Sequence, residues 1–191
     1  TIVEQTNAIN FDVTYSGDRV TGGFTVQYSI ADITTAIGTD YTVSPATGTL
    51  TFTGVDNEVR SVQINIVGDD FIENDEQLSI TISNPSIPEI SFSNTNAIGT
   101  ITNDDTGTIA VTGFDEDEFD VTTNFDVAYT GKPINGGFTA DYEITDVTTT
   151  SGNDYSVVSQ TGTLNFSGST TEVIQVPVTI IQDAILEGDE T

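Results

Sequence analysis

The chain contains no cysteine, histidine, methionine or tryptophan among its 191 residues. Without cysteine it can form neither a disulfide nor a thiolate zinc site, and the redox compartment cannot be inferred from cysteine usage. Without histidine or cysteine, no Ser–His or Cys–His nucleophile can exist. Paired carboxylates could in principle hydrolyse sugars, but the absence of tryptophan disfavours a sugar-binding cleft. We therefore predict that the protein is not an enzyme.

Basic residues are also scarce. The chain has three lysines and arginines in total and 30 acidic residues, which gives a net charge of -27. Nucleic acid is therefore excluded as a partner, because binding a phosphate backbone requires lysine and arginine. The same deficit excludes an anionic membrane surface, and the apolar runs are too short to insert into a bilayer. The negative electrostatic potential of such a chain attracts cations, metal ions above all.

The sequence repeats itself with an offset of 114 residues. GGFTVQYSIADITT at Gly22–Thr35 returns as GGFTADYEITDVTT at Gly136–Thr149, and TGTLTFTG returns as TGTLNFSG. A repeat of this length indicates two copies of one domain, and not a stacked solenoid. We predict domains at residues 1–105 and 106–191.

Each copy alternates apolar and polar residues over short runs punctuated by Gly, Asn, Asp and Ser, as at Phe24, Val26, Tyr28 and Ile30. An alternation of apolar and polar residues in which the apolar ones are β-branched or aromatic predicts half-buried β-strands. About seven strands in about 100 residues are typical of an immunoglobulin-like sandwich. The fold class is therefore all-β, with two tandem seven-stranded antiparallel sandwiches. The second copy stops at Thr191, opposite Gln77, and lacks its last two strands, so we expect the native chain to continue.

Acidic residues gather in the loops, most densely in GDDFIENDEQ at Gly68–Gln77. If each strand reverses direction, four acidic segments fall at one end of the first sandwich: Glu4, Asp40, the run Asp69–Glu76, and Asp104 with Asp105. Clustered carboxylates repel one another, and Ca²⁺ relieves the repulsion by taking about 6–8 oxygen ligands. Zinc lacks its usual ligands here, and Mg²⁺ fits less well because it keeps its waters. The alternative is a solvated acidic surface without metal.

These motifs together resemble the Calx-β domain. The resemblance is carried by GTDYT, TGTLTF, DDFIENDEQLSITISNP and GTITNDD, and by GNDYS and DAILEGDET in the second copy. It implies a seven-stranded sandwich, as in the sodium–calcium exchanger, integrin β4 and bacterial surface proteins, with calcium bound at one end. The ligands it implies in the first copy are Glu4, Asp40, Asp69, Asp70, the Phe71 carbonyl, Glu73, Glu76, Asp104 and Asp105. Those in the second copy are Glu118, Asp154, Asp183, Glu187 and Glu190.

Some positions depart from the pattern of strong calcium binders. Gly68 and Asn103 stand where those members have aspartates, and Ala184 replaces Asp70 in the second copy. We therefore expect fewer ions or weaker binding, with the second site the weaker. Asp75 is interpreted as a cap for backbone amides and not as a ligand.

The function predicted from these features is a calcium-binding structural repeat of a long bacterial adhesin or stalk protein, with calcium rigidifying the loops and the joint between domains. Its partners would be neighbouring repeat domains of the same chain and an unknown adhesion target, and its location extracellular or at the cell surface. The alternative is a calcium-sensing regulatory module whose interdomain angle responds to calcium. A carbohydrate- or protein-binding adhesive module would need an exposed aromatic platform, which the sequence does not indicate.

Overall fold

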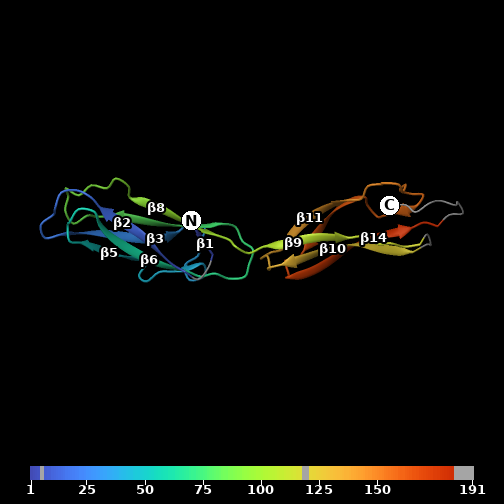
Figure 1. The fold of residues 1–191 in the computed structure, drawn as a ribbon, viewed down its shortest axis with the longest axis horizontal. Coiled ribbons are helices and arrows are strands. Elements are labelled where there is room, and N and C mark those ends of the chain that lie inside the picture. Colours follow the sequence, from blue (N-terminus) through green and yellow to red (C-terminus); the bar gives the residue numbers. More distant parts are fainter. Residues whose placement is uncertain (5–6, 118–120, 183–191) are drawn as a thin grey trace. The chain divides into compact units, whose positions relative to one another are not determined.

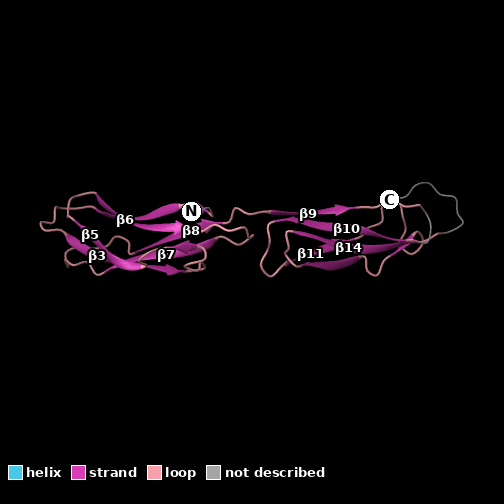
Figure 2. Ribbon diagram, turned by 90° about the horizontal axis from the view of Figure 1, so that it is seen from below, coloured by secondary structure: helices cyan, strands magenta, loops and turns pink. Residues whose placement is uncertain are grey.

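The computed structural model describes residues 1–4, 7–117 and 121–182. These residues form strands and loops without any helix, which confirms the predicted all-β class (Figure 2). The described part of the chain accordingly contains no helix that could cross a membrane. Contacts divide the chain into two compact units, residues 1–69 with 74–104, and residues 70–73 with 105–191.

The first unit consists of two sheets that enclose a single core (Figure 1). Its five-stranded sheet has the order β1-β8-β7-β3-β5, and its three-stranded sheet has the order β2-β6-β4. The bounds are β1 Ile2–Val3, β2 Ala8–Tyr15, β3 Phe24–Asp32, β4 Tyr41–Thr42, β5 Thr47–Phe52, β6 Glu58–Ile66, β7 Glu76–Ser83 and β8 Asn96–Thr102. The sequence predicts about seven strands in this copy, and its described residues form eight, of which the two-residue β4 is the shortest together with β1.

The second unit repeats this pattern in part. A four-stranded sheet has the order β12-β14-β10-β9, and a two-stranded sheet pairs β11 with β13. The bounds are β9 Gly107–Thr112, β10 Thr122–Gly131, β11 Phe138–Glu143, β12 Tyr155–Ser156, β13 Thr161–Phe166 and β14 Thr171–Ile180. By the repeat offset, β11 and β13 are the counterparts of β3 and β5.

Alternating burial explains why these runs form sandwich strands. In β6 every second residue from Val62 to Ile66 is buried, and Ile64 and Ile66 are fully buried. The aromatic packing is the same in both units. Phe24 stacks on Phe52 with ring centroids 4.9 Å apart, and their counterparts in the second unit stack at 4.8 Å with the same interplanar angle of 6°. Such a pair adds about 0.5–1.5 kcal/mol beyond its area burial, so the repeat preserves the centre of each core.

Candidate calcium site

Strand ends bring the acidic segments of the first copy together, as strand parity predicts. The backbone N–H of Glu4, just after β1, donates to the Thr102 carbonyl at the end of β8 (2.8 Å). The N–H of Val67, just after β6, donates to the carbonyl of Asp40, just before β4 (2.9 Å). These backbone bonds place the chain after β1, the turn before β4, the β6–β7 segment and the exit of β8 at one end of the sandwich.

Three predicted ligands form a compact group at this end. One carboxylate oxygen from each of Glu4, Asp69 and Glu73 can be chosen so that all three lie within 4.8 Å of one another. Glu4 and Glu73 are partly buried, whereas Asp69 is exposed. Calcium binds oxygen at about 2.3–2.6 Å, so two oxygens on one ion are at most about 5 Å apart. The spacing and the all-oxygen donor set therefore fit Ca²⁺.

Other predicted ligands lie near this group without belonging to it. One carboxylate oxygen of Asp40 accepts the backbone N–H of Ala36 (2.5 Å), which closes the turn that carries it. Glu76 is the first residue of β7 and faces Ile101 of β8. Phe71 is partly buried in the β6–β7 segment, and Asp104 is exposed beyond β8. These four positions could add donors around the group, but the described structure does not place their oxygens within it.

Two further predicted ligands are paired with a lysine that the sequence analysis left without a role. The Lys132 ammonium group forms an ion pair with Asp70, and its nitrogen lies 3.9 Å from a carboxylate oxygen of Asp105. All three residues belong to the second unit. The repeat contained a signal for this contact, because Lys132 aligns with Asp18 and reverses its charge. Part of the positive charge that the acidic run needs is therefore supplied by the chain itself.

The Asp75 carboxylate accepts a hydrogen bond from the backbone N–H of Asn103 (3.2 Å). Asp75 thus binds a backbone amide, the role interpreted from sequence. The amide, however, belongs to the segment after β8 and not to the turn around Asp75. The bond ties the start of β7 to the β8 exit that carries the predicted ligands Asp104 and Asp105.

A hydrogen-bond network that the sequence analysis missed supports the Asp40 turn, and it joins the exposed Asp32 to the buried Tyr41 and Thr35. Asp32, at the end of β3, accepts hydrogen bonds from the Tyr41 hydroxyl (2.7 Å) and the Thr35 hydroxyl (3.1 Å). Tyr41 is only 1% exposed, and it directly follows Asp40 in the chain. Burial and the hydrogen bond to Asp32 both raise the pKa of the Tyr41 hydroxyl, so it stays a neutral donor. The network fixes the backbone beside Asp40.

The second copy reproduces this support. The Tyr155 hydroxyl donates to Asp146 (2.5 Å), and that bond together with burial raises the pKa of Tyr155. Asp154 accepts the N–H of Thr150, and its carbonyl accepts the N–H of Ile181 (2.9 Å), as Asp40 does with Ala36 and Val67. The remaining predicted ligands of this copy lie outside the described residues: Glu118, Asp183, Glu187 and Glu190. The signal for both networks was the aspartate nine residues before the tyrosine in each copy.

Comparison with known protein families agrees with the resemblance predicted from the sequence motifs. The Calx-beta domain profile matches residues 1–106 and again residues 102–191. The chain belongs to the Calx-beta domain family. The two matches confirm the predicted resemblance and the tandem of two Calx-beta domains. No curated protein matches the chain.

Solved structures of tandem and single Calx-type domains are similar to this chain. The apo form of the Calx CBD1 domain is 30% identical over 55% of this chain and 88% of that chain, with a TM-score of 0.48. The calcium binding domain CBD12 of CALX1.1 is 22% identical over 95% and 72%, and CBD12 from CALX1.2 is 19% identical over 97% and 73%, both with TM-scores of 0.49. Because all three scores are below 0.5, the family assignment rests on the profile match.

Proposed function

We propose that the first Calx-beta domain binds Ca²⁺ through Glu4, Asp69 and Glu73. The observation that carries this proposal is the convergence of three carboxylates from separate chain positions within 4.8 Å. In a chain with a net charge of -27, such a group costs free energy through repulsion unless a cation joins it. Asp40, Glu76, Asp104 and the Phe71 carbonyl are the nearby positions that could complete a coordination shell.

Bound calcium would tie the end of β1 to the β6–β7 segment, because Glu4 belongs to the first and the two other ligands to the second. An ion that binds only the folded state stabilises it by RT ln(1 + [Ca²⁺]/Kd), which is about 2.7 kcal/mol at a hundredfold excess over Kd. Weak sites of about 10⁻⁴–10⁻³ M are typical of extracellular modules. Calcium would then act as a structural clamp on otherwise repelling loops.

On this basis we propose a structural repeat of an extracellular or cell-surface protein, with neighbouring Calx-beta domains of the same chain as its partners and an adhesion role toward an unidentified target. The tandem arrangement, the absence of cysteine and the exposed Thr, Ser and Asn on the strands favour this role. Membership of a family of binding modules supports the prediction that the protein is not an enzyme.

A calcium-sensing regulatory module is the second candidate, and one observation favours it. Asp70 and Asp105, both predicted ligands, are paired with Lys132. Calcium and this ammonium group would compete for the same carboxylates, so binding would exchange one set of contacts for another. Affinity discriminates between the two roles: submicromolar binding with a large change in shape supports the sensor, whereas weak binding with stiffening supports the structural repeat.

The test is a thermal melt of the chain in 1 mM Ca²⁺, in chelator, and in Mg²⁺ at equal ionic strength. We expect Ca²⁺ to raise the Tm, and Glu73→Gln to remove most of that rise. In chelator the same variant should be as stable as the parent or more stable, because a repelling charge is gone. Glu89→Gln, at an exposed loop position, is the charge-matched control and should keep the full rise. A Tm that Ca²⁺ leaves unchanged refutes calcium binding.

A further inference from the structure

The loop between β10 and β11 contains a dipeptide that occurs once in the sequence. Asn135 is followed by Gly136, and no other asparagine of the chain precedes a glycine. In the first copy the corresponding residues are Thr21 and Gly22, so the asparagine distinguishes the second copy. The side-chain amide of an asparagine can be attacked by the backbone nitrogen of the next residue, and glycine hinders this attack least because it has no side chain. The dipeptide is therefore a candidate site of covalent modification.

The backbone around Asn135 forms a type II turn. The N–H of Gly137 donates to the Ile134 carbonyl (3.1 Å), and Gly136, at the third position of the turn, has a φ of +81°. A type II turn requires a positive φ at that position, which glycine adopts without strain. Asn135 and Gly136 are both exposed. The turn therefore holds the dipeptide in solvent.

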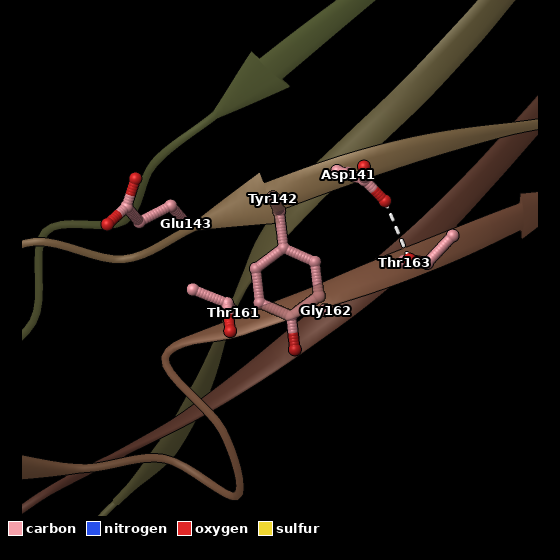
Figure 3. A pocket seen from close by; sticks show the side chains of 6 residues that line it. All are labelled: Asp141, Tyr142, Glu143, Thr161, Gly162 and Thr163. Carbon is pink, nitrogen blue, oxygen red and sulfur yellow. Dashed lines mark hydrogen bonds between the residues drawn. The ribbon is translucent and has the colours of Figure 1, made fainter.

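The backbone nitrogen of Gly136 is accessible. Within the described residues its N–H makes no hydrogen bond, and apart from its chain neighbours nothing lies within 4 Å of the position that a Cβ on Gly136 would occupy. Gly162 of β13 shows the contrast, since the Tyr142 ring lies over it (Figure 3) and a Cβ there would be 2.6 Å from that ring. The surroundings of Gly136 thus leave room for a compact ring to form between it and Asn135.

Other asparagines of the described structure lack this combination of features. Asn153 also lies in a turn of the second unit, but the N–H of the next residue, Asp154, donates to the Thr150 carbonyl (3.1 Å). Asn84 precedes a proline, which has no N–H to lose. Asn165 lies within β13, where pairing with β11 fixes the backbone that follows it. Position in the fold, and not residue type alone, therefore distinguishes Asn135.

We propose that Asn135 is a site of spontaneous deamidation. The Gly136 backbone nitrogen loses its proton to solvent base and attacks Cγ of Asn135. A new C–N bond forms, the bond from Cγ to the side-chain nitrogen breaks, and that nitrogen takes up a proton and leaves as ammonia. Water then opens the resulting succinimide ring at either carbonyl, which gives aspartate or isoaspartate at position 135. The net reaction consumes water and releases ammonia, and no atom is oxidised or reduced.

The products change the second domain and leave the first unmodified. Either product adds a carboxylate to the loop between β10 and β11, which also carries Lys132. Isoaspartate in addition lengthens the backbone of the turn, because the chain then runs through the side-chain carbon. The next part of the turn tolerates little displacement, since a Cβ on Gly137 would collide with the Phe166 carbonyl. The second domain therefore acquires a charge with age, whereas Thr21 keeps the equivalent turn of the first domain unchanged.

The experiment incubates the whole chain in a mildly alkaline buffer for several weeks and follows each asparagine by peptide mapping with mass spectrometry. We expect conversion of amide to acid first at Asn135, with two products that differ in retention and fragmentation. Asn153 should react at least about tenfold more slowly, because its attacking N–H must first leave a hydrogen bond. Asn135→Thr should abolish the conversion. Thr21→Asn should create a second site in the first domain, since its turn has the same backbone bond and an equally open Gly22, with a φ of +92°.

The proposal is overturned if Asn135 stays intact, if Asn153 reacts as fast, or if Thr21→Asn creates no reactive site. A parallel incubation in urea tests whether the folded turn itself reacts. The folded and unfolded chains should react within about tenfold of each other, since opening an exposed turn costs little free energy. A larger deficit of the folded chain would assign the reaction to the unfolded state and overturn the proposal. Methyl signals of Ile64 and Val178, one in each core, verify folding; if a variant is unfolded, the rates of the parent chain decide alone.

Discussion

The hydrogen bond from Tyr41 to Asp32 should be among the strongest single polar contributions to the first domain. Tyr41→Phe removes a buried hydroxyl that donates to a carboxylate 2.7 Å away, while Thr35 remains as a second donor to the same oxygen. Hydrogen bonds to charged groups contribute about 1.5–3 kcal/mol. We therefore expect the free energy of unfolding of the first domain to fall by about that amount. With a urea m-value of about 2 kcal/mol/M, the midpoint falls by about 1 M.

The assay is a urea titration that follows methyl NMR signals from both cores. Ile64 reports on the first core and Val178 on the second, and both are almost fully buried. Tyr41→Phe should lower the midpoint at Ile64 and leave Val178 nearly unchanged. Tyr155→Phe, which removes the equivalent bond to Asp146, should do the reverse and is the matched control.

The same network predicts the effect of alkaline pH. The pKa of folded Tyr41 is raised above the value near 10.0 that the unfolded chain retains. The contribution of the Tyr41 hydroxyl to the free energy of unfolding is therefore complete below pH 10. It declines as the pH rises above that value, because the tyrosine of the unfolded chain releases its proton first. Tyr41→Phe should lack this part of the decline. The reasoning is refuted if Tyr41→Phe shifts the Ile64 midpoint by less than about 0.25 M, since a loss of about 0.5 kcal/mol would mean that the charge-assisted bond contributes little.

Two further predictions concern surface charges. The backbone N–H of Thr53 lowers the pKa of Glu58, and the N–H of Gly54 and the Arg60 guanidinium act in the same direction. The ionised Glu58 therefore stabilises the fold above pH 4.5, and this stabilisation is lost as the pH falls through the folded pKa. Glu58→Gln should lower the Ile64 midpoint at pH 7 and much less at pH 3; equal losses at both would contradict this. Lys132→Met removes an ammonium group that competes with calcium for Asp70 and Asp105, and it should raise the calcium affinity about two- to fivefold, as measured by calorimetry. The reason is that a partly exposed ion pair contributes about 0.5–1 kcal/mol. An unchanged affinity would show that Asp70 and Asp105 are not ligands.

The prediction of the fold from sequence succeeded where the pattern is local. Alternation of apolar residues, as from Val62 to Ile66, fixes which face of a strand is buried, and the repeat offset shows that both copies share one plan. The short β4 could not be predicted, because two residues carry no periodicity. It is defined only by its long-range pairing, in which Tyr41 and Thr42 lie opposite Ile66 and Asn65 at the end of β6.

The candidate site was predicted only in outline. Strand parity located the end of the sandwich, but it did not distinguish Glu4, Asp69 and Glu73, which converge, from Asp70, which is paired with Lys132. Asp32 was missed as well, since a carboxylate at the end of a strand resembles any solvated loop residue until its tyrosine partner is placed.

The sequence by itself determined the all-β class, the duplicated domain, the excess of carboxylates and the choice of oxygen as the ligand atom. Those properties follow from composition and short-range period. The tertiary structure decided which carboxylates meet and which acquire a lysine or tyrosine partner. These outcomes depend on distances between residues remote in sequence, and electrostatic and hydrogen-bond energies depend on such distances.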